Sequence, residues 1–299
     1  MKTLVLTLAL VGPLAMASPA APAPKGDAGA AATKAYTYKK TPKGDLRMTV
    51  HFPPGWKAAD KRPAIVFFFG GGWTGGTIKQ FADQAAYLAS RGMVAARADY
   101  RVKSRQGVTP DACVEDAKSA VRWLRQKAAD LGIDPDRLAA SGGSAGGHIA
   151  ACAAMTPGLD AKDEDASVSS KPNALVLFNP VLDLRNLGRH GAGLGDETVK
   201  AISPNLHVAS DTPPAILFYG TKDKFRAHGQ AMVAKSKEAG NRVELWTAAD
   251  QPHTFFNRPP WKQLTLIQAD TFLVSLGYLK GKPTVRPPSG TTQKLDKAG

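Results

Sequence analysis

Short apolar runs alternate along the chain with longer segments in which apolar residues recur every three or four positions. A run of about four to eight residues that is apolar throughout is typical of a strand covered on both faces of a sheet. Strands are expected on this basis at residues 46–52, 64–69, 94–99, 138–141, 174–179, 215–220 and 243–246. The first run alternates apolar and polar residues before a Pro-Pro pair, which is typical of a partly exposed strand.

Amphipathic helical patterns lie between these runs. Helices are expected at residues 79–91, 110–131, 144–155, 226–240 and 262–277. In the second pattern Val114, Ala117 and Val121 fall on one face, and Thr109-Pro110 supplies an N-cap and a first-turn proline. Because strands and helices alternate, the chain is predicted to be an α/β protein, with a mainly parallel sheet and helices on both faces, over residues 41–280.

The composition is compatible with one large domain and excludes several other classes. The 299 residues are 43% hydrophobic, which suffices for a sizeable core and excludes a wholly disordered chain. Two cysteines, Cys113 and Cys152, are too few for a disulfide framework or a four-cysteine zinc site. They fall at different depths along neighbouring predicted helices, so no disulfide is expected between them. No His, Asp and Glu residues have metal-ligand spacing, and neither a metal nor another cofactor is predicted.

The two ends of the chain differ from the middle. Residues 1–17 combine a charged start, an apolar stretch and small residues at Ala15-Met16-Ala17, which predicts a cleaved secretory signal peptide. A secreted or periplasmic protein is therefore expected, with no transmembrane segment left after cleavage; a retained N-terminal anchor is the alternative. An Ala/Pro-rich tether at 18–40 and a basic tail at 281–299 are predicted to be disordered.

The net charge of +14 is unevenly distributed, because residues 18–40 contribute +3 and residues 280–299 contribute +4. Charge on flexible ends attracts acidic polymers without specificity. The chain has no basic run interleaved with aromatic residues and no nucleic-acid-binding motif. No specific nucleic-acid partner is therefore predicted, and the oligomeric state is left open.

The most informative stretch contains Gly142-x-Ser144-x-Gly146, which directly follows a predicted strand and directly precedes a helical pattern. This is the context of a nucleophile elbow, in which a serine stands on a strained turn with its hydroxyl exposed. The backbone N–H of Ala145 would then lie free beside that hydroxyl. Ser144 is therefore the candidate nucleophile.

A second glycine-rich segment, Gly70-Gly71-Gly72, ends another buried strand. Three consecutive glycines leave backbone N–H groups unpaired and easily approached. Such donors can stabilise the negative charge of a tetrahedral intermediate. Gly71, Gly72 and Ala145 are therefore the candidate oxyanion hole.

Together these segments resemble the α/β-hydrolases, specifically the secreted esterase and lipase branch with hormone-sensitive-lipase-like and acetylxylan or feruloyl esterase-like members. The resemblance covers about residues 41–280 and rests on the following segments: Phe69 to Trp73, Asp99-Tyr100-Arg101, Glu115-Asp116, Gly142 to His148, Pro213 to Asp223, and His253. One departure is Phe69, where many relatives have a histidine. The resemblance implies a serine hydrolase that acts on carboxylic esters.

A catalytic triad then follows in the order of this fold, which is serine, acid and histidine. Asp223 follows the strand ending at Gly220, and His253 lies in the loop after the last predicted strand. His253 would take the proton of Ser144, and Asp223 would orient the imidazole. Asp183 is the rival acid, because some branches of the fold draw the acid from the end of the preceding strand.

The expected substrate is a short-chain acyl ester, either a small molecule or an acetyl or feruloyl group on a polysaccharide. The sequence has no helical cap before its first predicted strand, and Trp73 and Phe255 could stack against a sugar or an aromatic acyl group. Two alternatives remain: a secreted peptidase of the prolyl-oligopeptidase type, and an inactive glycan-binding relative.

Overall fold

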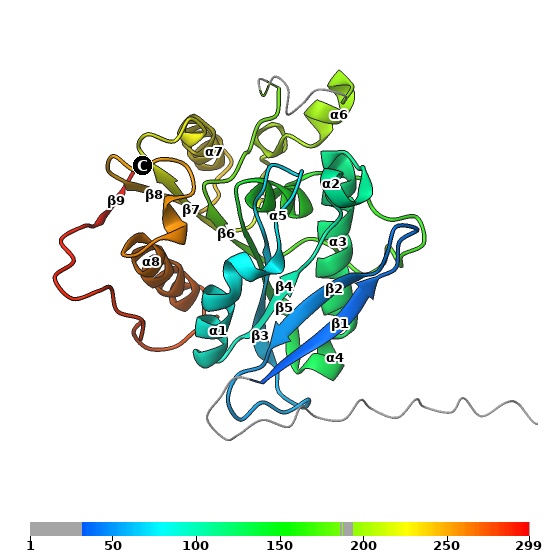
Figure 1. The fold of residues 1–299 in the computed structure, drawn as a ribbon, viewed down its shortest axis with the longest axis horizontal. Coiled ribbons are helices and arrows are strands. Elements are labelled where there is room, and N and C mark those ends of the chain that lie inside the picture. Colours follow the sequence, from blue (N-terminus) through cyan, green and yellow to red (C-terminus); the bar gives the residue numbers. More distant parts are fainter. Residues whose placement is uncertain (1–31, 186, 188–193, 299) are drawn as a thin grey trace, which may run out of the picture.

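A nine-stranded sheet runs through the molecule in the order β1-β2-β4-β3-β5-β6-β7-β8-β9 (Figure 1). The computed structural model describes residues 32–185, 187 and 194–298. The strands are β1 (Thr33–Lys39), β2 (Leu46–His51), β3 (Arg62–Phe68), β4 (Val94–Ala98), β5 (Ile133–Gly143), β6 (Ala174–Phe178), β7 (Ala215–Gly220), β8 (Val243–Ala248) and β9 (Leu295–Lys297). The six strands from β4 to β8 in this order are parallel, whereas β1, β2 and β9 pair antiparallel. The predicted mainly parallel α/β sheet is confirmed.

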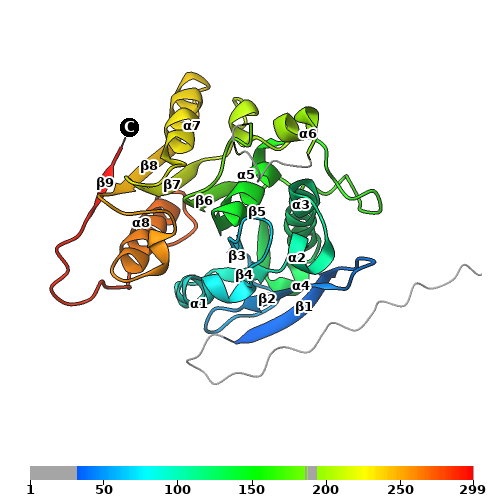
Figure 2. The ribbon, with the colours of Figure 1, turned by 45° about the horizontal axis from the view of Figure 1, so that its top comes forward.

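Helices cover both faces of this sheet (Figure 2). One face carries α1 (Ala82–Ser90) and α8 (Trp261–Ser275), and the other carries α3 (Pro110–Gln126), α5 (Ala145–Met155) and α7 (Arg226–Glu238). Shorter helices are α2 (Lys103–Gln106), α4 (Ala128–Leu131) and α6 (Asp196–Ala201), with 3-10 turns at Ile78–Phe81, Pro204–Leu206 and Phe255–Asn257. Among the described residues, no helix combines the length and hydropathy needed to cross a lipid bilayer.

The helices on both faces of the sheet explain the continuous apolar runs. In β3, Val66 and Phe68 pack into the core shared with α3 and α5, whereas Ile65 and Phe67 pack into the core shared with α1 and α8. Because successive strand residues point to opposite faces, a strand covered on both sides needs apolar residues at every position. All seven predicted strands and all five predicted helices are present, although the helix expected at 110–131 is divided at Lys127 into α3 and α4.

The predicted tether at 18–40 is wrong at its C-terminal end, because β1 begins at Thr33 and pairs antiparallel with β2. Within β1, Tyr38 is buried, and the ring of Tyr36 packs against that of Trp123 on α3 at 5.5 Å. The alternation of these tyrosines is a strand signal that the Ala/Pro-rich residues before them obscured. The folded domain therefore includes residues before 41. The predicted signal peptide and residues 18–31 of the tether lie outside the described residues.

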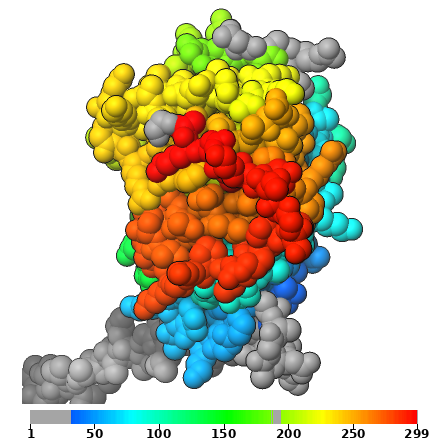
Figure 3. All heavy atoms as spheres, turned by 90° about the vertical axis from the view of Figure 1, so that its left-hand side faces the viewer, coloured from blue at the N-terminus to red at the C-terminus, as the bar shows by residue number. Residues whose placement is uncertain are grey.

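The predicted disordered tail at 281–299 also needs correction. The chain leaves α8, passes over the outer side of the molecule and adds β9 to the edge of the sheet beside β8 (Figure 3). The hydroxyl of Tyr87 accepts the N–H of Thr284 at 3.1 Å, and Arg91 donates to the carbonyl of Lys280 at 2.9 Å. Tyr87 and Arg91 contact the backbone of the tail and are distant in the sequence. The residues of the tail therefore show no apolar periodicity that would predict these contacts.

Two histidines are buried in the neutral form and couple stability to pH. Burial lowers the pKa of His148 to about 4, and burial together with the Arg97 guanidinium lowers the pKa of His51 to about 4. The unfolded chain, with ordinary histidine pKa values near 6.5, therefore binds more protons than the folded chain between about pH 6.5 and 4. The contribution of these two histidines to the free energy of unfolding is therefore fully present above about pH 6.5 and is lost as the pH falls to about 4.

We therefore expect the free energy of unfolding, measured with urea, to decrease between pH 6.5 and 4. His148 alone accounts for roughly 3 kcal/mol of this loss, from a pKa lowered to about 4. Carboxylates with lowered pKa values, such as Asp160, add to this loss only from about pH 5 downwards, as the unfolded chain begins to protonate them. A His51→Gln variant should show a shallower decrease, and a flat profile from pH 6.5 to 4.5 would contradict the assignment.

Candidate active site

Ser144 occupies the sharp turn between β5 and α5. Its backbone has φ 53° and ψ −117°, which is strained for a residue with a side chain, and its N–H donates to the carbonyl of Phe178 at 2.9 Å. The flanking glycines are required by close packing, since a Cβ on Gly146 would lie 2.1 Å from the oxygen of Phe68, and one on Gly142 would lie 2.4 Å from Gly146. The G-x-S-x-G spacing thus lets strand and helix pass closely and holds the hydroxyl outward.

The structure brings Ser144, His253 and Asp223 together. His253 Nε2 lies 2.9 Å from Ser144 Oγ, and His253 Nδ1 lies 2.7 Å from Asp223 Oδ2. Asp223 follows β7 and His253 follows β8, so both loops lie at the carboxyl ends of neighbouring parallel strands. The Asp223 side chain is fully buried, and its other oxygen accepts the N–H of Phe225 at 2.9 Å. Serine, histidine and carboxylate form one continuous hydrogen-bonded relay.

Asp183, the rival acid, is engaged elsewhere. Its carboxylate pairs with Arg185 at 2.6 Å. Burial raises the pKa of Asp183, but hydrogen bonds from Arg185 outweigh burial and hold that pKa below its ordinary value. Of the two candidate acids, only Asp223 has a hydrogen bond to His253 among the interactions of the described residues.

The glycine loop lies directly against the nucleophile. A Cβ built on Gly70 would be 3.4 Å from the Cβ of Ser144. Within the described part of the chain, no hydrogen bond uses the N–H of Gly71 or Gly72, and Ala145 is the first residue of α5, whose N–H has no partner within the helix. These three amides are therefore available beside the serine, as an oxyanion hole requires.

The two predicted substrate contacts are placed differently from expectation. Trp73 is only 4% exposed, and its indole N–H donates inward to Nδ1 of His148 at 3.1 Å. The prediction that Trp73 stacks against substrate therefore gains no support from its position. Phe255 is also largely buried, against Phe256 and Trp261, but it lines a small cavity of about 180 Å³ beside His253.

Three residues that the sequence did not single out support the relay. Asn179, which follows β6 with φ 38°, accepts the N–H of Thr254 at 3.2 Å, and its Nδ2 lies 3.3 Å from His253 Nε2. Gln80 accepts the N–H of Gly70 at 2.6 Å and so fixes the start of the glycine loop. The ring of Phe225 packs edge-on against His253 at 5.3 Å. The signal available in the sequence was an Asn-Pro pair directly after the apolar run of β6, because asparagine is favoured where the backbone turns at a strand end.

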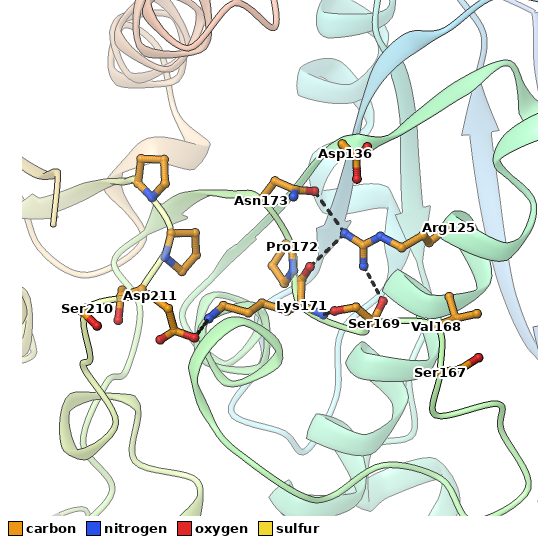
Figure 4. Close-up of a pocket in the computed structure, with 13 residues that line it drawn as sticks. Arg125, Asp136, Ser167, Val168, Ser169, Lys171, Pro172, Asn173, Ser210 and Asp211 are labelled. Carbon is orange, nitrogen blue, oxygen red and sulfur yellow. Dashed lines mark hydrogen bonds and ion pairs between the residues drawn. The ribbon is translucent and has the colours of Figure 1, made fainter.

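A larger cavity of about 680 Å³ lies away from the relay (Figure 4). It is lined by residues next to the amino ends of β6 and β7, including Asn173 and Pro214, whereas the triad lies at the carboxyl ends. Arg125 in this cavity donates to the backbone of Lys171 and to Asn173, and Lys171 pairs with Asp211. The charged side chains of Arg125 and Lys171 thus bind neighbouring loops of the protein to one another. In the described residues, no group of three or more His, Cys, Asp or Glu side chains could hold a metal ion.

Comparison with known proteins agrees with this geometry. A family model described as BD-FAE matches residues 48–237, which is more than half of the chain. The chain belongs to the BD-FAE family. Among solved structures, Thermogutta terrifontis esterase 2 phosphoramylated by tabun is 48% identical, with a TM-score of 0.80, and the match covers 84% of this chain and 97% of that chain. The predicted α/β-hydrolase resemblance is thereby confirmed.

Curated relatives point to the same class of enzyme. Carboxylesterase NlhH of Mycobacterium tuberculosis is 28% identical over 71% of this chain and 72% of its own length. The probable isoprenylcysteine alpha-carbonyl methylesterase ICMEL1 of Arabidopsis thaliana is 32% identical over 59% of this chain. The match spans only 41% of the plant protein, so this chain resembles part of it. This BD-FAE family member is a carboxylic ester hydrolase.

Proposed function

We propose that this hydrolase cleaves short-chain acyl esters through an acyl-enzyme on Ser144. The observation that carries the proposal is the relay from Ser144 Oγ through both nitrogens of His253 to Asp223, with distances of 2.9 and 2.7 Å. A serine hydroxyl is a poor nucleophile unless a base takes its proton, and the relay supplies that base.

In the first half-reaction, Ser144 Oγ attacks the ester carbonyl carbon while its proton passes to Nε2 of His253. The carbonyl oxygen becomes negatively charged, and the amides of Gly71, Gly72 and Ala145 stabilise that charge. The intermediate collapses with cleavage of the ester C–O bond, and the leaving alcohol takes the proton from Nε2. Water then attacks the acyl-enzyme by the same route, so that Ser144 is restored and the carboxylic acid leaves.

Short acyl groups, such as acetyl groups on polysaccharides or small molecules, are the proposed substrates, and feruloyl esters are a second group to test. Thermogutta terrifontis esterase 2 has been solved with propionate and with butyrate bound, at 48% and 47% identity to this chain. Helix α6, in the described part of the segment between β6 and β7, has the mostly polar sequence DETVKA. It therefore lacks the broad apolar face that a lipase lid presents to long acyl chains. Export of the mature chain, directed by residues 1–17, belongs to the same proposal.

The test combines covalent labelling with a chain-length series. Thermogutta terrifontis esterase 2 is phosphorylated by paraoxon, and we expect paraoxon to modify this chain once, on the tryptic peptide that contains Ser144. Among p-nitrophenyl esters, kcat/KM should be highest for acyl groups of about two to four carbons, because the propionate and butyrate bound in Thermogutta terrifontis esterase 2 are acids of this size.

A maximum at eight or more carbons would contradict the short-chain assignment. Hydrolysis of peptide amides without turnover of esters would favour the peptidase alternative. Glycan binding that persists without any hydrolysis would favour the inactive relative. For localisation, the secreted fraction of cells expressing the full chain should contain a product that lacks residues 1–17, and a product that retains them would contradict cleavage.

A further inference from the structure

His148 lies fully buried one turn into α5 and connects three segments of the active-site region. Its Nδ1 accepts the indole N–H of Trp73 at 3.1 Å, and its Nε2 lies 2.7 Å from the carbonyl oxygen of Ile202. The rings of Trp73 and His148 meet edge to face at 5.1 Å. Trp73 ends the glycine loop, His148 belongs to the nucleophile helix, and Ile202 follows α6.

The positions of the protons in this chain of hydrogen bonds follow from the partners. An indole N–H can only donate, so Nδ1 of His148 must be an acceptor. Burial lowers the pKa of His148 to about 4, and the ring is therefore neutral at neutral pH, with its single proton on Nε2. That proton is donated to the carbonyl of Ile202. With its proton on Nε2, His148 therefore pairs both ring nitrogens, and the indole N–H of Trp73 has its acceptor.

The glycine loop needs such an anchor because its own backbone is unusual. Gly71, Gly72 and Trp73 all have positive φ, at 137°, 61° and 58°. For tryptophan this conformation is strained and persists only when surrounding contacts enforce it. The indole of Trp73 is inserted into the core, where its N–H bond to His148 holds the end of the loop.

The same hydrogen bond links the two segments that carry the candidate oxyanion amides. His148 sits one helical turn beyond Ser144, and its N–H donates to the carbonyl of Ser144 at 2.9 Å. Ala145, at the start of that turn, provides one amide, and Gly71 and Gly72, just before Trp73, provide the others. The link from Trp73 to His148 is therefore a side-chain hydrogen bond between the two elements that carry these donors.

We propose that His148 is a positioning residue that, through Trp73, sets the amides of Gly71 and Gly72 at the distance from Ala145 that the tetrahedral intermediate needs. The proposal rests on the proposed acyl-enzyme function. Loss of one oxyanion donor in other enzymes lowers kcat by about 10²- to 10³-fold, and a displaced donor should cost part of that. Binding of the ground-state ester, whose carbonyl is not yet charged, should change little.

Trp73→Phe tests the proposal, with Trp56→Phe as its matched control. Trp56 also donates its indole N–H to a backbone carbonyl, that of Leu131 at 2.8 Å, but it lies near the amino ends of the strands. Both variants lose one indole hydrogen bond, so both should lose thermal stability. With p-nitrophenyl acetate, only Trp73→Phe should lower kcat, by at least tenfold, with KM within twofold of the wild type.

Two substitutions of His148 separate its two hydrogen bonds. The amide oxygen of asparagine can take the place of Nδ1, and the amide of glutamine can take the place of Nε2. His148→Asn should therefore keep the bond from Trp73 and most of kcat, whereas His148→Gln should keep the contact with Ile202 and lose kcat as Trp73→Phe does. This rescue by one amide, but not by the other, is not expected from a general loss of packing.

The outcomes distinguish this proposal from the function on which it rests. If paraoxon labels Ser144 in the wild type but Trp73→Phe and Trp56→Phe have equal kcat, the role of His148 is overturned and the function stands. Equal loss in His148→Asn and His148→Gln would likewise overturn it. If Ser144 is neither labelled nor needed for turnover, the proposed function itself fails.

Discussion

Replacement of Ser144 by alanine is expected to lower kcat for p-nitrophenyl acetate by on the order of 10⁵- to 10⁶-fold. Without Oγ no acyl-enzyme can form, and His253 has no proton to take from a nucleophile held 2.9 Å from its Nε2. The oxyanion amides remain, so a residual rate above that in water should persist. Steady-state assays and paraoxon labelling of the same preparation measure the loss, and labelling should disappear with the activity.

Ser141→Ala is the matched control for this substitution. Ser141 lies three residues earlier in β5, is fully buried, and donates its hydroxyl to the carbonyl of Val176 at 2.7 Å. Its loss should cost stability, roughly 1 kcal/mol for one buried hydrogen bond, and leave kcat close to that of the wild type. Retention of more than about one per cent of kcat in Ser144→Ala would remove the serine from the mechanism.

The triad was predictable because its local signals were strong. The sequence places Ser144 between a strand and a helix, with glycines that close packing requires, and the fold orders the acid and the histidine after it. Periodicity likewise located the parallel strands, because a strand buried on both faces leaves a continuous apolar run. For these elements, the residues that the tertiary environment requires are the same ones that form the local sequence pattern, so the pattern alone predicts them.

The remaining features depend on contacts between distant segments. Trp73 was expected to face the substrate, but whether its indole points inward is decided by His148, seventy-five residues later. Asn179, at the end of β6, reaches His253, in the loop after β8, because β6, β7 and β8 are consecutive parallel strands of the sheet. Strand β9 is three residues long and pairs with β8 across some fifty residues of chain. No periodicity within such a segment identifies its partner.

Replacement of the triad acid is the second substitution that we expect to lower kcat strongly. Asp223→Asn is expected to lower kcat by about 10⁴-fold, because an asparagine amide in that place can donate to Nδ1 of His253. The imidazole would then carry its proton on Nε2, facing Ser144 Oγ, and could not accept the serine proton. Since Asp223 is fully buried and bonded to Nδ1 at 2.7 Å, little else can replace its carboxylate.

Asp183→Asn is the matched control, because it makes the same substitution at the other candidate acid. It removes a carboxylate that pairs with Arg185 and has no hydrogen bond to His253 among the described interactions, so kcat should stay within about threefold of the wild type. Both variants should label with paraoxon at rates that follow their kcat, since labelling needs the same proton transfer. A large loss in Asp183→Asn together with a small one in Asp223→Asn would transfer the role to the end of β6. Comparable losses in both would contradict the assignment of Asp223 alone as the acid that orients His253.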